Sequence, residues 1–423
     1  MSSGPLKYPL IDYIPLFLLV CLSGNPLFTT GKLQKPFLML FAAGFIVYSL
    51  YYITAKALNK GVRLLMITIL FIVLLSAFQL YTLGYVSYPG VFALVLKVIL
   101  GLFFLVYYQG IGINPYLMYV NLFSFLAKVS LPLFALNFFT FAGLPLDVPY
   151  TKSLLLYTSF DLPKDMLRNS GMFWEPGAFA GYLILALLFI ILQNRGFTLG
   201  AYKKQAIWIV IGLLTTLSTT GFLVLALILL IYIVQNYKYG KFILIPVIAV
   251  GGYFAYNNLE ILGEKLEDQY NEAAEMDKSD VSNTRFGALN MDLQYIEDKP
   301  FTGNGLDKRT RYRFHPWVDD GIGHGNGMSN FIVYWGIPFF LFWLICVFRF
   351  AYVSTASVST AVWFSVIMLL VLQGEQFLNY PLFLLFFIAP AIEFLWDDEE
   401  EEEDLEEPDS SKTPVAILNQ PIH

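Results

Sequence analysis

The sequence predicts an all-α polytopic membrane protein with about 12 transmembrane helices and a large outer loop between the ninth and tenth spans. The first observation is that 57% of the 423 residues are hydrophobic and only 14% are charged, whereas soluble domains carry about 25% charged residues. The second is a mean hydropathy of +0.62. The third is that apolar runs near the ~20 residues needed to cross a bilayer recur along the chain. This composition excludes a soluble enzyme, a disordered protein and a nucleic-acid binder, because too few polar side chains remain to cover a soluble surface.

The predicted spans follow the apolar runs in order, and two of them are short. They lie at residues 11–28, 36–55, 62–83, 88–108, 116–141, 174–193, 205–218, 220–236, 242–256, 328–350, 360–377 and 380–396.

Lysine and arginine placement predicts the orientation. If the spans alternate, Lys7, Lys60, Arg195 and Arg349 fall on one side, which the positive-inside rule makes cytoplasmic. Both termini are then cytoplasmic, and the two long loops at 142–173 and 257–327 face outward as a cap on a single transmembrane domain, residues 1–396.

The C-terminal segment, residues 397–423, is predicted to be a disordered cytoplasmic tail. Residues 397–409 hold 11 acids, and such a run repels itself and cannot bury apolar area. Residues 1–396 contain 25 basic and 21 acidic residues, so the formal net charge of -6 for the whole chain comes from the acidic tail. Partner binding by the tail is the alternative interpretation.

The first candidate site lies at the mouth of the span at 174–193. Arg168 precedes a glycine turn and then Glu175-Pro176, and proline suits the first turn of a helix. Arg168 and the helix N-terminus are suited to receive an anion. The alternative is an interfacial arginine anchor with a carboxylate that balances the helix dipole. Hydroxyls at 218–220 either line a polar cavity or satisfy the backbone of a tight turn.

Further candidates lie in the loop at 257–327. Arg285 opens a segment with helical spacing at Phe286, Leu289, Leu293 and Ile296, and this segment leads to the Gly-x-Gly turn of Gly303 and Gly305. No strand–helix unit surrounds that turn, so it is no nucleotide fingerprint.

Four cations follow within six residues: Lys308, Arg309, Arg311 and Arg313. They suit either anionic lipid headgroups or capture of a phosphorylated substrate or acidic sugar.

His324 and Asn326 immediately precede the span at 328–350. A neutral histidine can accept a proton from a hydroxyl at ordinary pH, although a lone interfacial histidine often only forms hydrogen bonds. With two histidines in this loop and no cysteine or close carboxylate pair there, no metal site is expected.

The order of these elements resembles the O-antigen polymerase and O-antigen ligase superfamily of bacterial inner-membrane glycosyltransferases. Three segments carry the resemblance: Arg168…Gly171…Glu175-Pro176, Arg285…Pro300-Phe301-Thr302-Gly303-Asn304-Gly305, and His324…Asn326…Gly336. In many relatives the histidine is directly followed by asparagine, about eleven residues before a glycine. Here Gly325 intervenes, and counting back from Gly336 places Asn326 in that register.

The resemblance implies a polymerase of lipid-linked repeat units (O-antigen, capsule or exopolysaccharide) at the periplasmic face of the bacterial inner membrane. Arg168 and Arg285 would hold the undecaprenyl diphosphate, helped by the basic cluster and the Gly303–Gly305 turn. His324, Asn326 and Glu175 would be the candidate catalytic groups, and no metal or other cofactor is required. A flippase and a chain-length regulator are the expected partners, besides membrane lipid; no nucleic acid is expected.

Two alternatives stay open. A ligase would run the same chemistry with lipid A core or protein as acceptor, although Glu175-Pro176 is more like polymerases than ligases. A transporter or flippase of lipid-linked sugar would place ionisable groups within its spans near the midplane. Few such groups occur here, the main candidates being Lys97, Lys128, Glu375 and Glu393.

Overall fold

The computed structural model describes most of the chain. The described residues are 8–29, 55–140, 147–148, 151–160, 168–237, 285–315 and 326–394, with a few single positions between 36 and 47 and at 242 and 246. The predicted spans at 36–55 and 242–256 lie almost wholly outside these ranges, as does the acidic tail.

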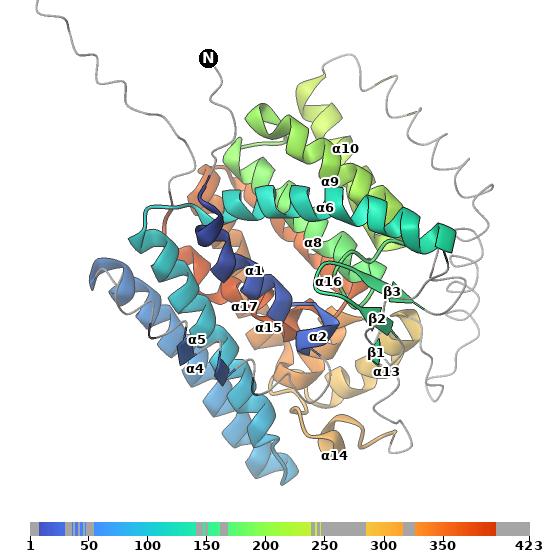
Figure 1. Cartoon of the computed structure of the whole chain (residues 1–423). Coiled ribbons are helices and arrows are strands. Elements are labelled where there is room, and N and C mark those ends of the chain that lie inside the picture. The colour runs from blue at the N-terminus through green and yellow to red at the C-terminus, as the bar shows by residue number, and fades with distance from the viewer. Residues whose placement is uncertain are drawn as a thin grey trace, which may run out of the picture.

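The described residues are mostly helical (Figure 1). The longer helices are α1 (Tyr13–Leu22), α4 (Ala55–Leu83), α5 (Tyr88–Gly110), α6 (Pro115–Thr140), α8 (Pro176–Gln193), α9 (Lys203–Thr215), α10 (Thr219–Asn236), α13 (Arg285–Asp298), α15 (Gly327–Thr355) and α16 (Val358–Gly374). The shorter ones are η1 (Leu10–Asp12), α2 (Pro26–Thr29), η2 (Gly200–Tyr202), α14 (Lys308–Arg311), η3 (Phe377–Asn379), α17 (Pro381–Leu384), η4 (Leu385–Phe387) and η5 (Ala389–Ala391).

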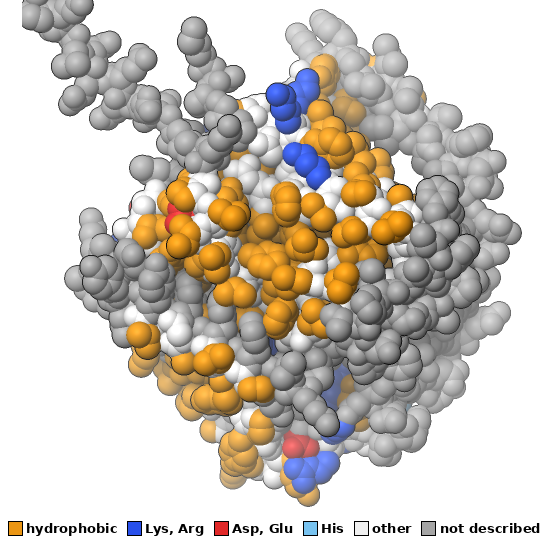
Figure 2. Space-filling model, in the orientation of Figure 1, with side chains coloured by type: hydrophobic (Ala, Val, Ile, Leu, Met, Phe, Trp, Pro, Cys, Tyr) orange, Lys and Arg blue, Asp and Glu red, His pale blue; other side chains and the backbone are white. Residues whose placement is uncertain are grey.

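Six helices in the described part of the chain are long and apolar enough to cross a membrane. They are Lys60–Leu83, Tyr88–Gly110, Pro115–Asn137, Pro176–Gln193, Thr219–Asn236 and Gly327–Thr355, and two shorter apolar helices cover Leu10–Leu22 and Val358–Gly374. Figure 2 shows hydrophobic side chains across the middle of one face, with Lys and Arg side chains toward its upper and lower margins. The chain is therefore a helical multi-pass membrane protein, as its composition predicts.

Helix α8 lies at the centre of the core. Every residue from Pro176 to Leu192 is buried, and α8 packs against α6, α9, α10, α15 and α16. A helix that is apolar on all sides is expected in such a position, because none of its faces gains from contact with water.

The predicted span at 380–396 is wrong as one continuous helix. The chain there forms short pieces, η3, α17, η4 and η5, interrupted near Pro381 and Pro390, which lack a backbone donor. Leu382–Ala389 are nonetheless 0–5% exposed. Non-helical backbone within a membrane occurs only where it is buried in protein or lines a water-filled cavity, because lipid cannot satisfy its polar groups. Here the segment is buried in protein.

Side chains from neighbouring helices satisfy the backbone of this broken segment. Lys97 Nζ of α5 donates to the Asn379 carbonyl at 2.7 Å, and Trp343 Nε1 of α15 donates to the Phe383 carbonyl at 3.0 Å. The Leu382 N–H donates to Ser23 Oγ at 3.1 Å. An apolar run alone does not predict this arrangement, because it depends on side chains far away in the sequence.

The predicted outer loop at 142–173 contains a small antiparallel sheet, a departure from a purely helical fold. Its strands are β1 (Asp147–Val148), β2 (Thr151–Ser153) and β3 (Thr158–Phe160), in the order β1-β2-β3. Val148 pairs with Thr151, and Ser153 pairs with Thr158.

The helix bundle has two distinct ends. At the motif end, which we define by Arg168, Thr220, Gly327 and Gly374, the starts of α8, α10 and α15 meet the end of α16: Gly374 packs on Thr220, and Gly327 packs on the Glu375 carbonyl.

At the opposite end, which we call the basic end, Tyr116 contacts Phe189 and Phe350. Lys60 Nζ lies 3.3 Å from Glu393 there. Gln205, next to Lys203 and Lys204, donates to Asn121 at 3.3 Å. Basic residues of several predicted cytoplasmic loops thus gather at one end of the bundle.

Candidate functional site

Hydrogen bonds to α6 and to the end of α9 anchor the segment before α8 at the motif end. Arg168 is 9% exposed, and its Nε donates to the Thr216 carbonyl at 3.3 Å. The next residue, Asn169, donates to Ser130 Oγ of α6 and to Thr215 Oγ1 of α9, both at 2.9 Å. An arginine fixed through Nε has its guanidinium plane oriented, which suits directional binding of an oxyanion.

Glu175 occupies the N-cap position of α8. Its backbone is extended, its carbonyl accepts from the Phe179 N–H at 3.2 Å, and Pro176 begins the helix as predicted. The half-buried carboxylate makes no capping hydrogen bond. Helix α8 therefore begins with an acidic side chain beside its N-terminus, where the helix dipole favours negative charge.

The hydroxyls between α9 and α10 mainly complete the helix ends. Thr216 Oγ1 donates to the Leu213 carbonyl at 2.7 Å, and Ser218 Oγ accepts from the Gly221 N–H at 3.3 Å as the cap of α10. This arrangement agrees with the backbone-satisfying interpretation of the turn. The turn also brings Thr216 to Arg168 and Thr220 to Gly374, so it links the segment before α8 to α16.

Asn326 caps α15 and joins it to α16. Its Oδ1 accepts from the Ser329 N–H at 3.1 Å, and its Nδ2 donates to Gln373 Oε1 at 3.0 Å. Asn326 is 2% exposed, and Glu375, two residues beyond Gln373, is 8% exposed. A buried amide and a buried carboxyl group therefore lie at the junction of these two helices.

A buried ion pair joins α13, α14 and α15. Arg311 and Asp292, at 1% and 0% side-chain exposure, form a direct ion pair. Asp292 also accepts from Ser329 Oγ at 2.5 Å, and Arg311 donates to Asn330 Oδ1 at 3.2 Å. The sequence predicts Arg311 as a substrate-binding cation, but the structure gives it a structural partner in Asp292, which the sequence prediction missed.

Aromatic rings surround Arg311. Its guanidinium lies 5.0–5.1 Å from the ring centres of Tyr295 and Tyr312 and 5.7 Å from that of Tyr334. Burial lowers the pKa of Arg311, but the Asp292 carboxylate together with Tyr334 and Tyr312 more than offsets this effect, so the pKa is raised. The guanidinium therefore stays charged inside an aromatic shell.

His315 extends this cluster. Its Nδ1 lies 3.0 Å from the Tyr295 hydroxyl, and the side chain is 3% exposed. Burial, together with the positive charge of Arg311, lowers the pKa of His315, so the neutral imidazole is favoured.

The other three cations of this run lie nearer the surface. Arg309 forms a bidentate pair with Asp307 at 2.9 Å and lies 3.8 Å from the ring centre of Tyr85, just after the end of α4. The hydrogen bonds from Arg309 lower the pKa of Asp307. Arg313 pairs with Asp298, and Lys308 is exposed. Of the four, Lys308 and Arg309 are thus the best placed to meet a ligand or a headgroup.

The Gly-x-Gly turn docks against a break in α15. Gly303 and Gly305 have φ values of +67° and +77°, which favour glycine, and Gly336 in α15 has φ +80°. The Gly305 N–H donates to the Tyr334 carbonyl at 3.1 Å. Gln79 of α4 donates to that same carbonyl at 2.8 Å. The glycines therefore allow two backbones to approach closely; their predicted contact with substrate stays a prediction.

Two predicted site residues lie wholly or partly outside the described part of the chain. His324 is not among the described residues, and Arg285 begins α13 although its side chain is not described. Among the described residues, no group of three or more His, Cys, Asp or Glu side chains is arranged to hold a metal ion.

The motif end thus brings together the described parts of all three segments that carry the resemblance. Arg168 reaches α10 through the turn at 215–220, α10 reaches α16 at Gly374, and α16 reaches Asn326 through Gln373. The segment at 285–311 joins through Asp292, which accepts a hydrogen bond from Ser329, and through Arg311, which donates to Asn330. No family model, no curated protein and no solved structure matches this chain.

Proposed function

We propose that the protein is a polymerase of lipid-linked oligosaccharide repeat units. It transfers a glycan from undecaprenyl diphosphate to a sugar hydroxyl of the incoming repeat, at the periplasmic face of a bacterial inner membrane, with both chain termini in the cytoplasm. The observation that carries the proposal is the meeting of the three motif segments, distant in sequence, at one end of an apolar bundle.

The diphosphate would bind at Arg168. An oriented guanidinium offers planar paired donors to phosphate oxygens and keeps its charge throughout the reaction. Arg285 begins α13 and would supply the second cation; Lys308 and Arg309 would attract the carrier from the membrane surface. These cations stabilise the charge that develops on the departing diphosphate.

An apolar groove on the same helices suits the lipid tail. A cavity of about 240 Å³ lies between α8, α9 and α10, with walls that include Leu187, Val210 and Ile228. Leu187 follows Pro176 by eleven residues, which is about 16 Å along a helix axis. A polyprenyl chain whose diphosphate sits near Arg168 would therefore pass this groove.

The reaction is a substitution at the anomeric carbon of the donor. The acceptor hydroxyl oxygen forms the new glycosidic bond, the bond to the diphosphate oxygen breaks, and the diphosphate leaves with the electron pair. The hydroxyl proton passes to a base, for which His324 or Glu175 is the candidate, while Asn326 orients the acceptor. The flippase and the chain-length regulator would supply repeats and limit the product.

Reconstitution tests the proposal. Purified protein in liposomes, given lipid-linked repeats and no ion gradient, is expected to lengthen the glycan, as resolved by gel electrophoresis. Arg168→Lys keeps the charge but loses the paired donors, so elongation should fall strongly; Arg349→Lys, an exposed substitution on α15, is the matched control. Full elongation by a folded Arg168→Lys protein would refute diphosphate binding at Arg168.

One observation favours a transporter of lipid-linked sugar as the second candidate. The broken segment η3–η5 lies inside the bundle and receives a hydrogen bond from Lys97 within α5, and transporters use discontinuous helices of this kind. Elongation without a gradient would exclude a pure transporter. A ligase shares the transfer chemistry, and it would instead attach a finished polymer to lipid A core or protein.

A further inference from the structure

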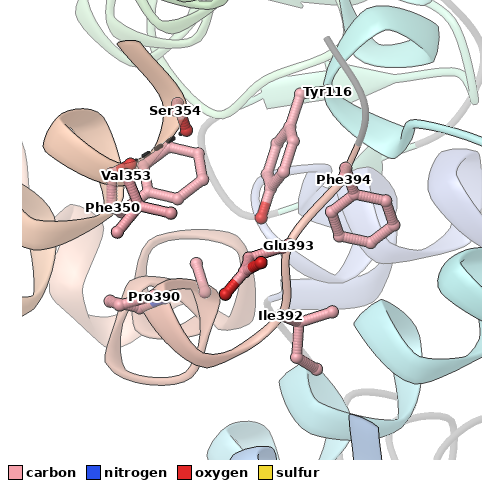
Figure 3. Close-up of a pocket in the computed structure, with 9 residues that line it drawn as sticks. Tyr116, Phe350, Val353, Ser354, Pro390, Ile392, Glu393 and Phe394 are labelled. Carbon is pink, nitrogen blue, oxygen red and sulfur yellow. Dashed lines mark hydrogen bonds between the residues drawn. The ribbon is translucent and has the colours of Figure 1, made fainter. Parts of the chain in front are cut away.

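A second cavity lies at the basic end, away from the proposed transfer site. Its volume is about 230 Å³, and it lies between the start of α6, the last turns of α15 and the chain after η5 (Figure 3). A single water needs only about 10–15 Å³, so this space accepts a small organic group.

Three aromatic rings from separate parts of the chain line the cavity. The ring centre of Tyr116 lies 4.9 Å from that of Phe350 and 5.6 Å from that of Phe394. The rings are inclined by 56° and 90°, so they form walls and not a stack. Aromatic faces carry partial negative charge and attract cations that lie over them.

A carboxylate completes the lining. Figure 3 shows the Glu393 side chain reaching between Phe350 and Phe394, with the Tyr116 hydroxyl directed toward it. The Glu393 carboxylate forms an ion pair with Lys60 at 3.3 Å, and the two side chains are 65% and 58% exposed. Such exposed pairs contribute little, so a second cation is able to replace Lys60.

This lining selects one chemical class of ligand. Calcium and magnesium require six or more oxygen ligands, which one carboxylate and aromatic rings do not supply. The carboxylate repels phosphate and other anions. An uncharged apolar group would desolvate the carboxylate without compensation. An alkylated ammonium ion satisfies both parts, because its charge faces Glu393 and its carbon substituents contact the rings.

We propose that the cavity formed by Tyr116, Phe350, Glu393 and Phe394 binds an organic ammonium group. Two sources share this chemistry: the headgroup of an aminophospholipid, and a soluble amine. The site is independent of the glycan-transfer proposal, because none of its residues belongs to the motif segments.

Thermal unfolding of the full chain in detergent tests the binding. Tetramethylammonium chloride should raise the unfolding midpoint saturably, while sodium chloride at equal ionic strength and the uncharged tert-butanol should not. Glu393→Gln should weaken the apparent affinity about tenfold or more, and Lys60→Gln should strengthen it severalfold, because it removes a competing cation. Glu297→Gln, an exposed carboxylate on α13, is the control and should leave the affinity unchanged.

Equal stabilisation by both salts, or an unchanged affinity in Glu393→Gln, would overturn the proposal. If Glu393→Gln does not fold, Phe394→Leu serves in its place, since it keeps apolar volume and removes a ring face. Nanodiscs distinguish the sources: if headgroups occupy the site, phosphatidylethanolamine discs should stabilise the protein relative to phosphatidylglycerol discs and block tetramethylammonium. If the ligand is soluble, tetramethylammonium should bind equally in both discs.

Discussion

Replacing Asp292 by asparagine should open the contact between α13–α14 and α15. The Arg311 guanidinium is 1% exposed, so the substitution leaves a buried positive charge without its carboxylate partner. Breaking a buried ion pair in this way costs about 3–5 kcal/mol. At about 1.4 kcal/mol per factor of ten, the open state should become about 100-fold more populated or more.

Hydrogen–deuterium exchange of α13 amides measures this population directly, because protection reports local opening. Asp292→Asn and Arg311→Gln should each reduce protection about 100-fold or more, and the double variant should lose far less than the sum of the two, since no unpaired charge remains. Arg309→Gln, which breaks only an exposed pair, should leave α13 protected. Additive losses, or full protection in Asp292→Asn, would refute the reasoning.

Three further predictions concern neighbouring residues. Gly336→Ala should lower the unfolding midpoint at a cost of about 1–3 kcal/mol, because the φ of +80° and ψ of 163° at this position suit only glycine. The added Cβ would also meet the Phe301 carbonyl. Gly196→Ala, a control with open space around the added Cβ, should leave the midpoint unchanged. Folding lowers the pKa of His315, so neutral His315 should contribute its full stabilisation above about pH 6.5, and this contribution should be lost as the pH falls through the pKa of the folded state. The unfolding midpoint of the His315→Gln variant should therefore depend less on pH over that range. Asn326→Ala should cost about 1 kcal/mol through loss of the α15 cap, whereas Asn326→Ser, which supplies a capping oxygen without burying a charge, should cost less, as thermal unfolding of both variants would show.

Apolar length and caps predict most of the helices. The runs at 88–108 and 220–236 correspond to α5, Tyr88–Gly110, and α10, Thr219–Asn236, because a bilayer demands continuous apolar helices of that length. The same criterion cannot detect the breaks in 380–396. There the interrupted backbone is satisfied by Lys97, Ser23 and Trp343, which the local sequence does not reveal.

The sequence predicts the helix α13, but its apolar spacing does not identify all of the buried positions. Of the apolar positions in that spacing, Leu293 is 43% exposed, whereas Ile296 packs against a buried cluster that includes Met291 and Tyr295. The structure buries Ala288, Met291, Asp292 and Tyr295, one position away on the same helical period. Burial of Asp292 could not be predicted from the local sequence, because an aspartate is rarely buried without a partner and its partner, Arg311, lies in a different helix.

The Asp292–Arg311 ion pair also connects the segment at 285–311 to the start of α15, where Asn326 is proposed to orient the acceptor. Asp292 accepts a hydrogen bond from Ser329, and Arg311 donates one to Asn330. Both Ser329 and Asn330 lie within about one helical turn of Asn326. Asn326 in turn fixes Gln373 at the end of α16. Opening the pair by Asp292→Asn should therefore reduce elongation without touching the Arg168 segment, and Asn330→Ala, which keeps both charges, should reduce it less. If Asp292→Asn and Asn330→Ala reduce elongation equally, the start of α15 depends on the hydrogen bond between Arg311 and Asn330 and not on the paired charge of Asp292.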